Sequence, residues 1–435
     1  MPDGEAMGQR DALGPTDIQT IEALYGTHNQ APVAVIHALE TSYDEGSHAY
    51  ISAHESYDPD DNSYILTYEW TLGDGTCTDP SPPPKCTSPT VFHPFADDGT
   101  YPITVAVSDG FATGTDNATA VVLNVAPTVD LGADAEIDEG DTFEREGSFE
   151  DPGADSWVAT VNYGDGSGVQ SLSLATDKTF DLSHTYVDDG IYTITVTVTD
   201  DDGGVGTDAL TVTVLNVPPS VDAGPDAEVL TGEDYDFYGT FEDPGVEDYP
   251  WTWVIDWDDG QTDAGSTNDQ DAPITATHRV CTAGDYTVTL TVTDKDGGVG
   301  ADALILTVPF LMVDIVVQPG ENANPLNLKR GGVGPVAIFS TLDFDASEID
   351  PASLRMGDVD SPSIPAAVRG NGAIQAELED VDGDGLLDLV VQFPIPDLVA
   401  SGEVDEYTTE VSVEGYLNDG CTNIKGVGHV SIRPM

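Results

Sequence analysis

Basic residues are the scarcest feature of this 435-residue sequence, which has 12 Lys and Arg against 80 Asp and Glu and a formal net charge of −68. A surface with this charge repels phosphate backbones and anionic lipid head groups. Binding to nucleic acid or to a membrane surface is therefore unfavourable. Divalent cations or high salt would relieve the self-repulsion, and a solvated acidic coat is the simplest interpretation of most of these carboxylates.

Long hydrophobic runs are also missing. No stretch approaches 18 apolar residues, so we predict no transmembrane helix and no membrane insertion. The first 30 residues show no basic start followed by an apolar run, so no export signal is visible. Cysteine occurs four times. Cys77 and Cys86 flank one turn-rich stretch, which predicts a local disulfide and an oxidising compartment, whereas Cys281 and Cys421 have no obvious mate.

Catalytic motifs are missing as well. The eight histidines are scattered, and none forms the His-Glu-x-x-His pair of a zinc protease, so no zinc site is predicted. The sequence has no Gly-x-Ser-x-Gly elbow and no phosphate-binding loop. His184 and His278 each precede a Gly-x-Tyr segment by a few residues, and we interpret them as structural. We predict that the chain is not an enzyme.

What the sequence does contain is one repeat in three copies. A Gly-Asp-Gly or Asp-Asp-Gly turn is followed 27 residues later by a Gly-x-Tyr turn, with the aspartates at Asp74, Asp165 and Asp259 and the tyrosines at Tyr101, Tyr192 and Tyr286. The segment YTITVTVTD from Tyr192 alternates apolar residues with threonines, which is the pattern of a strand with one buried face. Copies of about 90 residues with short strands and frequent glycine turns predict an all-β fold of immunoglobulin-like sandwiches.

The repeat resembles the PKD domain, whose signature is a Trp-x-Phe-Gly-Asp-Gly turn and a later Gly-x-Tyr strand. The apolar positions before the turn are Trp70 and Leu72 in the first copy, Val161 and Tyr163 in the second, and Ile255 and Trp257 in the third. On a strand, both positions point to one face, so these substitutions preserve the core face. The resemblance implies three PKD-like domains, over residues 30–125, 126–217 and 218–309.

Residues 310–435 form a different segment, which is similar to a small β-rich C-terminal module found in secreted bacterial proteins. Its stretch DVDGDGLLD places oxygen ligands at loop positions 1, 3, 5, 7 and 9, with glycine at position 6 for the sharp turn. The ligands would be the carboxylates of Asp380, Asp382, Asp384 and Asp388 and the carbonyl of Leu386. Val391 stands at position 12, where an EF-hand has Glu, and the residues after the loop predict a strand. The stretch thus resembles an EF-hand-type loop outside the EF-hand fold.

This loop predicts Ca²⁺ as a cofactor, bound weakly with a dissociation constant of about 10⁻⁴ to 10⁻³ M. The alternative is an acidic turn that holds no ion. Weaker calcium candidates lie at matching places in the three repeats, at residues 58–61, 150–152 and 242–244. The PKD resemblance supports calcium there, but polar turns before a strand explain these residues at least as well.

The opening stretch MGQRDALGPTDIQTIEALYG, residues 7–26, predicts one short amphipathic helix. It resembles the closing segment of astacin-type metzincin proteases through Gly8, Gln9, Arg10, Leu13, Asp17, Ile18, Ile21, Leu24, Tyr25 and Gly26. The resemblance implies that residues 1–29 are the remnant of a protease domain. The zinc motif of that family is absent from the sequence.

Together these features predict a non-catalytic, secreted or cell-surface β protein, whose role is spacing and adhesion to an extracellular polysaccharide or protein ligand. The favoured context is the tail of a secreted astacin-like metalloprotease. The alternative is a stand-alone cell-surface adhesion protein.

Overall fold

The computed structural model describes residues 29–37, 40–59, 65–75, 86–320, 325–329 and 331–433. The predicted helix within residues 7–26 lies outside the described residues. The chain divides into two units, of which unit 2 comprises residues 138–140, 187–189 and 216–435, and unit 1 comprises the remainder. We call the three repeats modules 1, 2 and 3 and the last segment the C-terminal module. Modules 1 and 2 lie in unit 1, except that two short loops of module 2 belong to unit 2.

Module 1 is a sandwich of two small sheets, one of four strands in the order β1-β6-β5-β3 and one of the pair β2-β4. The core between them includes Trp70 and Leu72 on one face of β3, as the alternation predicts. The strands are β1 (Tyr43–Asp44), β2 (His48–Ser52), β3 (Thr67–Leu72), β4 (Thr90–Pro94), β5 (Gly99–Ser108) and β6 (Thr113–Leu123).

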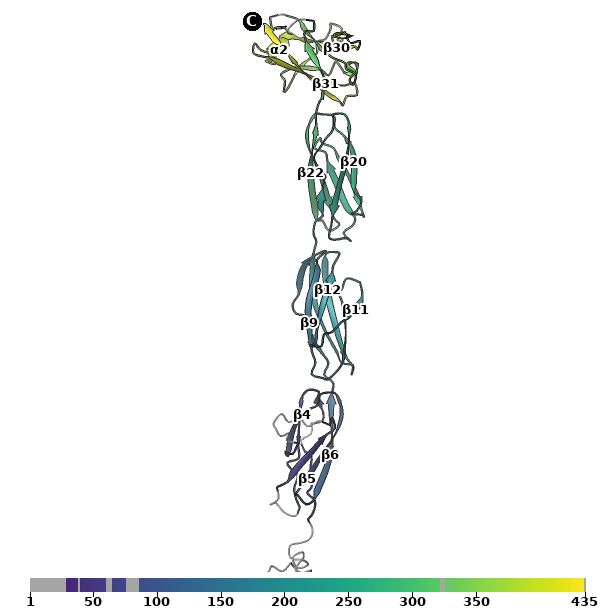
Figure 1. The fold of residues 1–435 in the computed structure, drawn as a ribbon, viewed down its shortest axis with the longest axis vertical. Coiled ribbons are helices and arrows are strands. Elements are labelled where there is room, and N and C mark those ends of the chain that lie inside the picture. Colours follow the sequence, from purple (N-terminus) through teal and green to yellow (C-terminus); the bar gives the residue numbers. More distant parts are fainter. Residues whose placement is uncertain are drawn as a thin grey trace, which may run out of the picture. The chain divides into compact units, whose positions relative to one another are not determined.

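Module 2 pairs a five-stranded sheet, β11-β10-β13-β14-β8, with a three-stranded sheet, β12-β9-β7 (Figure 1). On β13, Ile194, Val196 and Val198 are buried while the threonines between them are partly exposed. The strands are β7 (Thr128–Asp130), β8 (Ala135–Asp138), β9 (Thr142–Glu150), β10 (Trp157–Asn162), β11 (Val169–Leu172), β12 (Thr179–Thr185), β13 (Gly190–Asp200) and β14 (Val205–Leu215).

Module 3 repeats this arrangement with the sheets β16-β22-β21-β18-β19 and β15-β17-β20. Ile255 and Trp257 are buried in its core, at the positions of Val161 and Tyr163 in module 2. The strands are β15 (Ser220–Asp222), β16 (Ala227–Glu228), β17 (Asp234–Glu242), β18 (Trp251–Asp256), β19 (Thr262–Thr267), β20 (Ile274–Arg279), β21 (Gly284–Thr293) and β22 (Val299–Val308).

The C-terminal module has a five-stranded sheet, β23-β32-β31-β27-β28, a four-stranded sheet, β24-β26-β30-β29, and the pair β25-β33 around one core. Helix α2 (Ile395–Ser401) ends at Gly402, whose φ of +80° suits glycine. The other elements are β23 (Leu311–Met312), β24 (Ile315–Val317), β25 (Pro325–Asn327), β26 (Val333–Ile338), the 3₁₀ turn η1 (Ala346–Glu348), β27 (Arg355–Gly357), β28 (Ile364–Pro365), β29 (Ala376–Glu379), β30 (Asp388–Pro394), β31 (Glu410–Tyr416), β32 (Asn423–His429) and β33 (Ser431–Arg433). The predicted all-β fold class is confirmed.

Candidate functional site

The predicted calcium loop is the connection of a β-hairpin. It joins β29 to β30, which pair antiparallel from Glu379 opposite Asp388 to Ala376 opposite Val391. Gly383 and Gly385 adopt φ values of +81° and +92°, a backbone conformation that other residues rarely accept. The strand predicted after the loop is confirmed as β30.

Three of the predicted carboxylates lie exposed in this hairpin and bind its own backbone. Both oxygens of Asp380 accept an N–H, at 2.8 Å from Gly383 and 3.2 Å from Gly385. One oxygen of Asp382 accepts the N–H of Asp384 at 3.0 Å, and one oxygen of Asp384 accepts the N–H of Leu386 at 2.8 Å. Among the described residues, the second oxygen of Asp382 and of Asp384 has no hydrogen bond. The loop is therefore held in a turn with two carboxylate oxygens available.

Asp388 differs from the other three because it is completely buried. Its Oδ1 accepts the N–H of Ser340 at 3.0 Å and its Oδ2 accepts the N–H of Val381 at 2.8 Å. It thereby connects the start of the loop to the end of β26. The structure assigns Asp388 a structural role, whatever else it binds.

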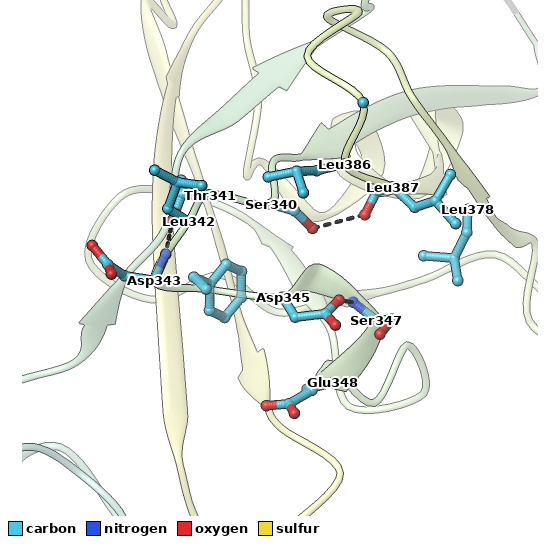
Figure 2. A pocket seen from close by; sticks show the side chains of 12 residues that line it. Ser340, Thr341, Leu342, Asp343, Asp345, Ser347, Glu348, Leu378, Leu386 and Leu387 are labelled. Atoms are coloured by element: carbon cyan, nitrogen blue, oxygen red, sulfur yellow. Dashed lines mark hydrogen bonds between the residues drawn. The ribbon is translucent and has the colours of Figure 1, made fainter.

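A hollow of about 630 Å³ lies beside the loop and is lined by Leu386, Leu387 and the segment from Ser340 to Asp345 (Figure 2). The Ser340 hydroxyl donates to the carbonyl of Leu387 at 2.7 Å and accepts the N–H of Ala346 at 2.8 Å. Both hydrogen bonds of this hydroxyl go to backbone groups, so it connects the loop to the start of η1.

The cysteines give one outcome that the sequence did not predict. Cys281 and Cys421, which had no obvious mate, form a disulfide at a sequence separation of 140, between module 3 and the C-terminal module. The Thr231 hydroxyl lies beside it, accepting the N–H of Asn423 at 3.2 Å. Cys86 is also disulfide-bonded. Its predicted partner, Cys77, lies outside the described residues, so that pairing stays a prediction.

The histidines of the repeats each bind the aspartate of the turn. The His–Asp distances are 2.6 Å for His93 with Asp74, 2.8 Å for His184 with Asp165, and 2.8 Å for His278 with Asp259. The His278 ring also stacks on Trp257, with centroids 4.4 Å apart. Burial raises the pKa of Asp259, but the hydrogen bonds from His278 and Gln261 outweigh it and hold that pKa below its usual value. These contacts fit the structural role predicted for His184 and His278.

The weaker calcium candidates lie in turns that a tryptophan closes. In module 2, Asp151 accepts the N–H of Gly153 at 2.8 Å and the indole N–H of Trp157 at 2.9 Å. Asp243 repeats this in module 3, with its indole partner at 2.6 Å. Asp60 and Asp61 of the first candidate lie outside the described residues. A polar turn accounts for Asp151 and Asp243 without an ion.

A second acidic cluster joins module 1 to module 2, and sequence reasoning missed it. One carboxylate oxygen from each of Glu45, Asp97 and Asp155 lies within 4.8 Å of the other two. The signal was present in the recurrence of Asp-Glu-Gly at residues 44–46 and 138–140. It could not be interpreted, because these residues meet only when two modules pack.

Comparison with solved structures gives matches at low sequence identity. Solved structures that match include a tetra-tandem repeat in the extending region of a large adhesion protein (15% identity, TM-score 0.33, covering 92% of this chain and 100% of that chain). The bacterial integrin-binding protein invasin matches at 12% identity and a TM-score of 0.33, covering 92% of this chain and 79% of that chain. The N-terminal eight Ig domains of Down Syndrome Cell Adhesion Molecule match at 11% identity and a TM-score of 0.26, covering 93% of this chain and 57% of that chain. These values are too low to indicate a shared function. No curated protein sequence matches the chain.

The part of the chain that the structure describes contains no helix long and apolar enough to cross a bilayer. The PKD domain family matches three successive segments, residues 29–123, 124–214 and 216–308, which together exceed half of the chain. These segments contain the three sandwiches and their Asp–His pairs. The chain therefore belongs to the PKD domain family.

Proposed function

We propose that this chain is a non-catalytic extracellular binding region, which holds a polysaccharide or protein ligand on the sheet surface of module 1. One observation carries the proposal. Tyr50 and Phe92 are directly opposite each other on β2 and β4, their ring centroids are 5.1 Å apart, and they are 41% and 60% exposed. Two neighbouring aromatic rings left in water on a small sheet are a feature of binding surfaces rather than of a core.

The chemistry of this aromatic pair suits a flat, extended ligand. Aromatic side chains supply a large apolar contact area at a low cost in conformational entropy, and they are enriched in binding interfaces. The Cys281–Cys421 disulfide supports a location outside the cytosol, because such bonds persist in oxidising compartments.

A co-sedimentation assay of the full chain with insoluble polysaccharides and with extracellular-matrix proteins tests the proposal. We expect one of these polymers to retain the protein, and we expect the double variant Tyr50→Ala, Phe92→Ala to lose most of that retention. Tyr407→Ala is the matched control, because Tyr407 is an 80% exposed aromatic residue in the C-terminal module. If both variants are retained like the parent, the aromatic pair is not the binding surface.

We also propose that the chain is the tail of a secreted astacin-like metalloprotease. The support is the sequence resemblance of residues 7–26, which lie outside the described residues. An in-frame His-Glu-x-x-His-x-x-Gly-x-x-His motif upstream of the Met1 codon would agree with it. A stop codon there would favour a stand-alone cell-surface adhesion protein.

We further propose that the hairpin loop binds Ca²⁺. Asp380, Asp382 and Asp384 would supply carboxylate oxygens and Leu386 a carbonyl oxygen. Asp388 would hold the loop in place by accepting the N–H groups of Val381 and Ser340. The free oxygens of Asp382 and Asp384 and the positive-φ glycines support the fit. Calorimetry of the full chain with CaCl₂ tests it, and Asp382→Ala with Asp384→Ala should remove one binding event. An unchanged titration would assign the loop to an ion-free turn.

A further inference from the structure

A lysine in the turn between β21 and β22 of module 3 provides the positive charge for a buried acidic cluster. In unit 2, the ammonium of Lys295 lies 2.6 Å from Asp188, 2.7 Å from Asp248 and 2.8 Å from Asp296. Asp248 is fully buried. Beside it, Glu139 is also buried and accepts the N–H of Val217 at 2.7 Å. One positive charge thus sits among three carboxylates.

The cluster in unit 1, which we call the first junction, repeats this arrangement. Glu45 is 2% exposed and accepts the N–H of Val125 at 2.7 Å, as Glu139 accepts that of Val217. Gly153 lies against the carboxyl groups of Glu45 and Asp155, as Gly245 lies against those of Glu139 and Asp248. By position in the repeat, Asp97 and Asp202 are the counterparts of Asp188 and Asp296, and Asp155 matches Asp248 by its contact with the glycine.

The cation itself has no counterpart at the first junction. Asp201 stands where Lys295 stands in the next copy, within DDDGG as against DKDGG. Its side chain accepts the N–H of Ser156 at 2.9 Å. Among the described residues, none of the first-junction carboxylates forms an ion pair with Lys, Arg or His. The substitution therefore replaces a positive charge by a negative one in an already acidic cluster.

Several oxygens of the first junction are buried without any partner. Oε2 of Glu45 and both carboxylate oxygens of Asp155 are inaccessible to solvent and, in the described part of the chain, accept no hydrogen bond. Leaving buried carboxylates unpaired is costly, because a desolvated charge needs a partner. Burial, and then the neighbouring charge of Glu45, raises the pKa of Asp155 to about 7.

We propose that the first junction binds one divalent cation, Ca²⁺, through Glu45, Asp97 and Asp155, with Asp98 and Asp202 at its open side. Ca²⁺ takes six to eight oxygens at about 2.3–2.6 Å, so two ligands on opposite sides are about 4.6–5.2 Å apart. The three oxygens, all within 4.8 Å of one another, meet this limit. Asp98 and Asp202 extend the cluster in a second group with Asp97.

The proposed ion would connect two modules. Glu45, Asp97 and Asp98 belong to module 1, whereas Asp155 and Asp202 belong to module 2. Asp151 lies in a separate group with Asp155 and Asp200, and its two oxygens accept the N–H of Gly153 and the indole N–H of Trp157. Ca²⁺ at the first junction would bring positive charge to the carboxylates of modules 1 and 2, as Lys295 does in the turn between β21 and β22 of module 3. This inference is independent of the ligand-binding role proposed above.

The internal repeat supplies a reciprocal test. Calorimetry and equilibrium dialysis of the full chain with CaCl₂ count the bound ions, and Asp201→Lys installs the residue that module 3 uses at this place. We expect Asp201→Lys, and separately Glu45→Gln with Asp155→Asn, to lose one Ca²⁺ relative to the parent chain. Lys295→Asp should gain one. Asp384→Ala, in the hairpin loop, controls for the other candidate site and should leave the first-junction ion in place.

The outcomes separate a calcium site from an empty acidic cluster. Loss of one Ca²⁺ in both first-junction variants, with an unchanged circular dichroism spectrum, supports the site. If Asp201→Lys folds and binds as many Ca²⁺ as the parent with the same affinity, the proposal is overturned. Should one variant unfold, the other decides by the same count, since each alters different atoms. Magnesium chloride in place of CaCl₂ should compete weakly, because Mg²⁺ demands a stricter octahedral geometry.

Discussion

Replacing Asp388 by alanine should open the β29–β30 hairpin without disturbing modules 1 to 3. The side chain is completely buried, and its two oxygens accept the N–H groups of Ser340 and Val381. Alanine leaves both donors without an acceptor, at about 1–3 kcal/mol for each such group. A total of about 2–6 kcal/mol is expected for the two groups. At about 1.4 kcal/mol per tenfold, this corresponds to local opening that is roughly 30- to 20,000-fold more frequent.

Hydrogen–deuterium exchange of the full chain measures this opening directly, because amide exchange reports local unfolding free energies. The experiment is run in EDTA so that bound calcium contributes nothing. Peptides from β26 and β30 should exchange faster in Asp388→Ala, whereas peptides from β13 should not change. Asp384→Ala is the matched control, because this carboxylate is exposed, and it should shift exchange by less than about 0.5 kcal/mol. Equal effects of the two alanine variants would refute a structural role for Asp388.

Three further outcomes are expected. Lys295→Met should destabilise the turn between β21 and β22 by about 3–5 kcal/mol, because it leaves the buried carboxylate of Asp248 without its ion pair. Hydrogen–deuterium exchange that matches the parent chain would contradict this stabilising role of the ion cluster. The pKa of Asp259 is held below its usual value in the folded protein, so the stability that this group contributes is present above about pH 4 and is lost as pH falls through the folded pKa. His278→Ala should therefore raise the midpoint pH of acid unfolding, followed by tryptophan fluorescence. An unchanged midpoint would show that the His278–Asp259 pair does not stabilise module 3. Cys281→Ser with Cys421→Ser should cost up to about 5 kcal/mol for a 140-residue separation, seen as faster proteolysis of the C-terminal module, and unchanged proteolysis would show that the interface holds without the bond.

Patterns that repeat at a short spacing predicted the fold well. Alternation along one strand suffices to place Ile194 and Val196 in a core, because a strand turns every second side chain to the same face. The substitution of Trp70 by Val161 in the next copy was therefore understandable without a structure. The turn at Gly383 and the strand β30 after it were predicted equally well, since the residues that form them are adjacent in the sequence.

Features built from distant residues could not be predicted in the same way. Cys281 and Cys421 approach each other only after two separately folded modules dock, and nothing local in either sequence specifies this. Glu45 and Asp155 meet through module packing for the same reason. Counting would have helped with the cysteines, because a local pair leaves two over, and comparison of DDDGG with DKDGG would have shown the exchanged charge at Asp201.

The Cys281–Cys421 bond also has a mechanical consequence. When the two ends of a chain are pulled apart, tension follows the shortest covalent path, which here passes through the two sulfur atoms. The intervening polypeptide, with strands β21 to β31, then carries none of the load. At about 3.4 Å per extended residue, the separation of 140 residues withholds roughly 47 nm of contour length from stretching. Under load the chain can therefore lengthen only outside the bond, through modules 1 and 2, through strands β15 to β20 of module 3, and through the short segment after Cys421 that contains β32 and β33.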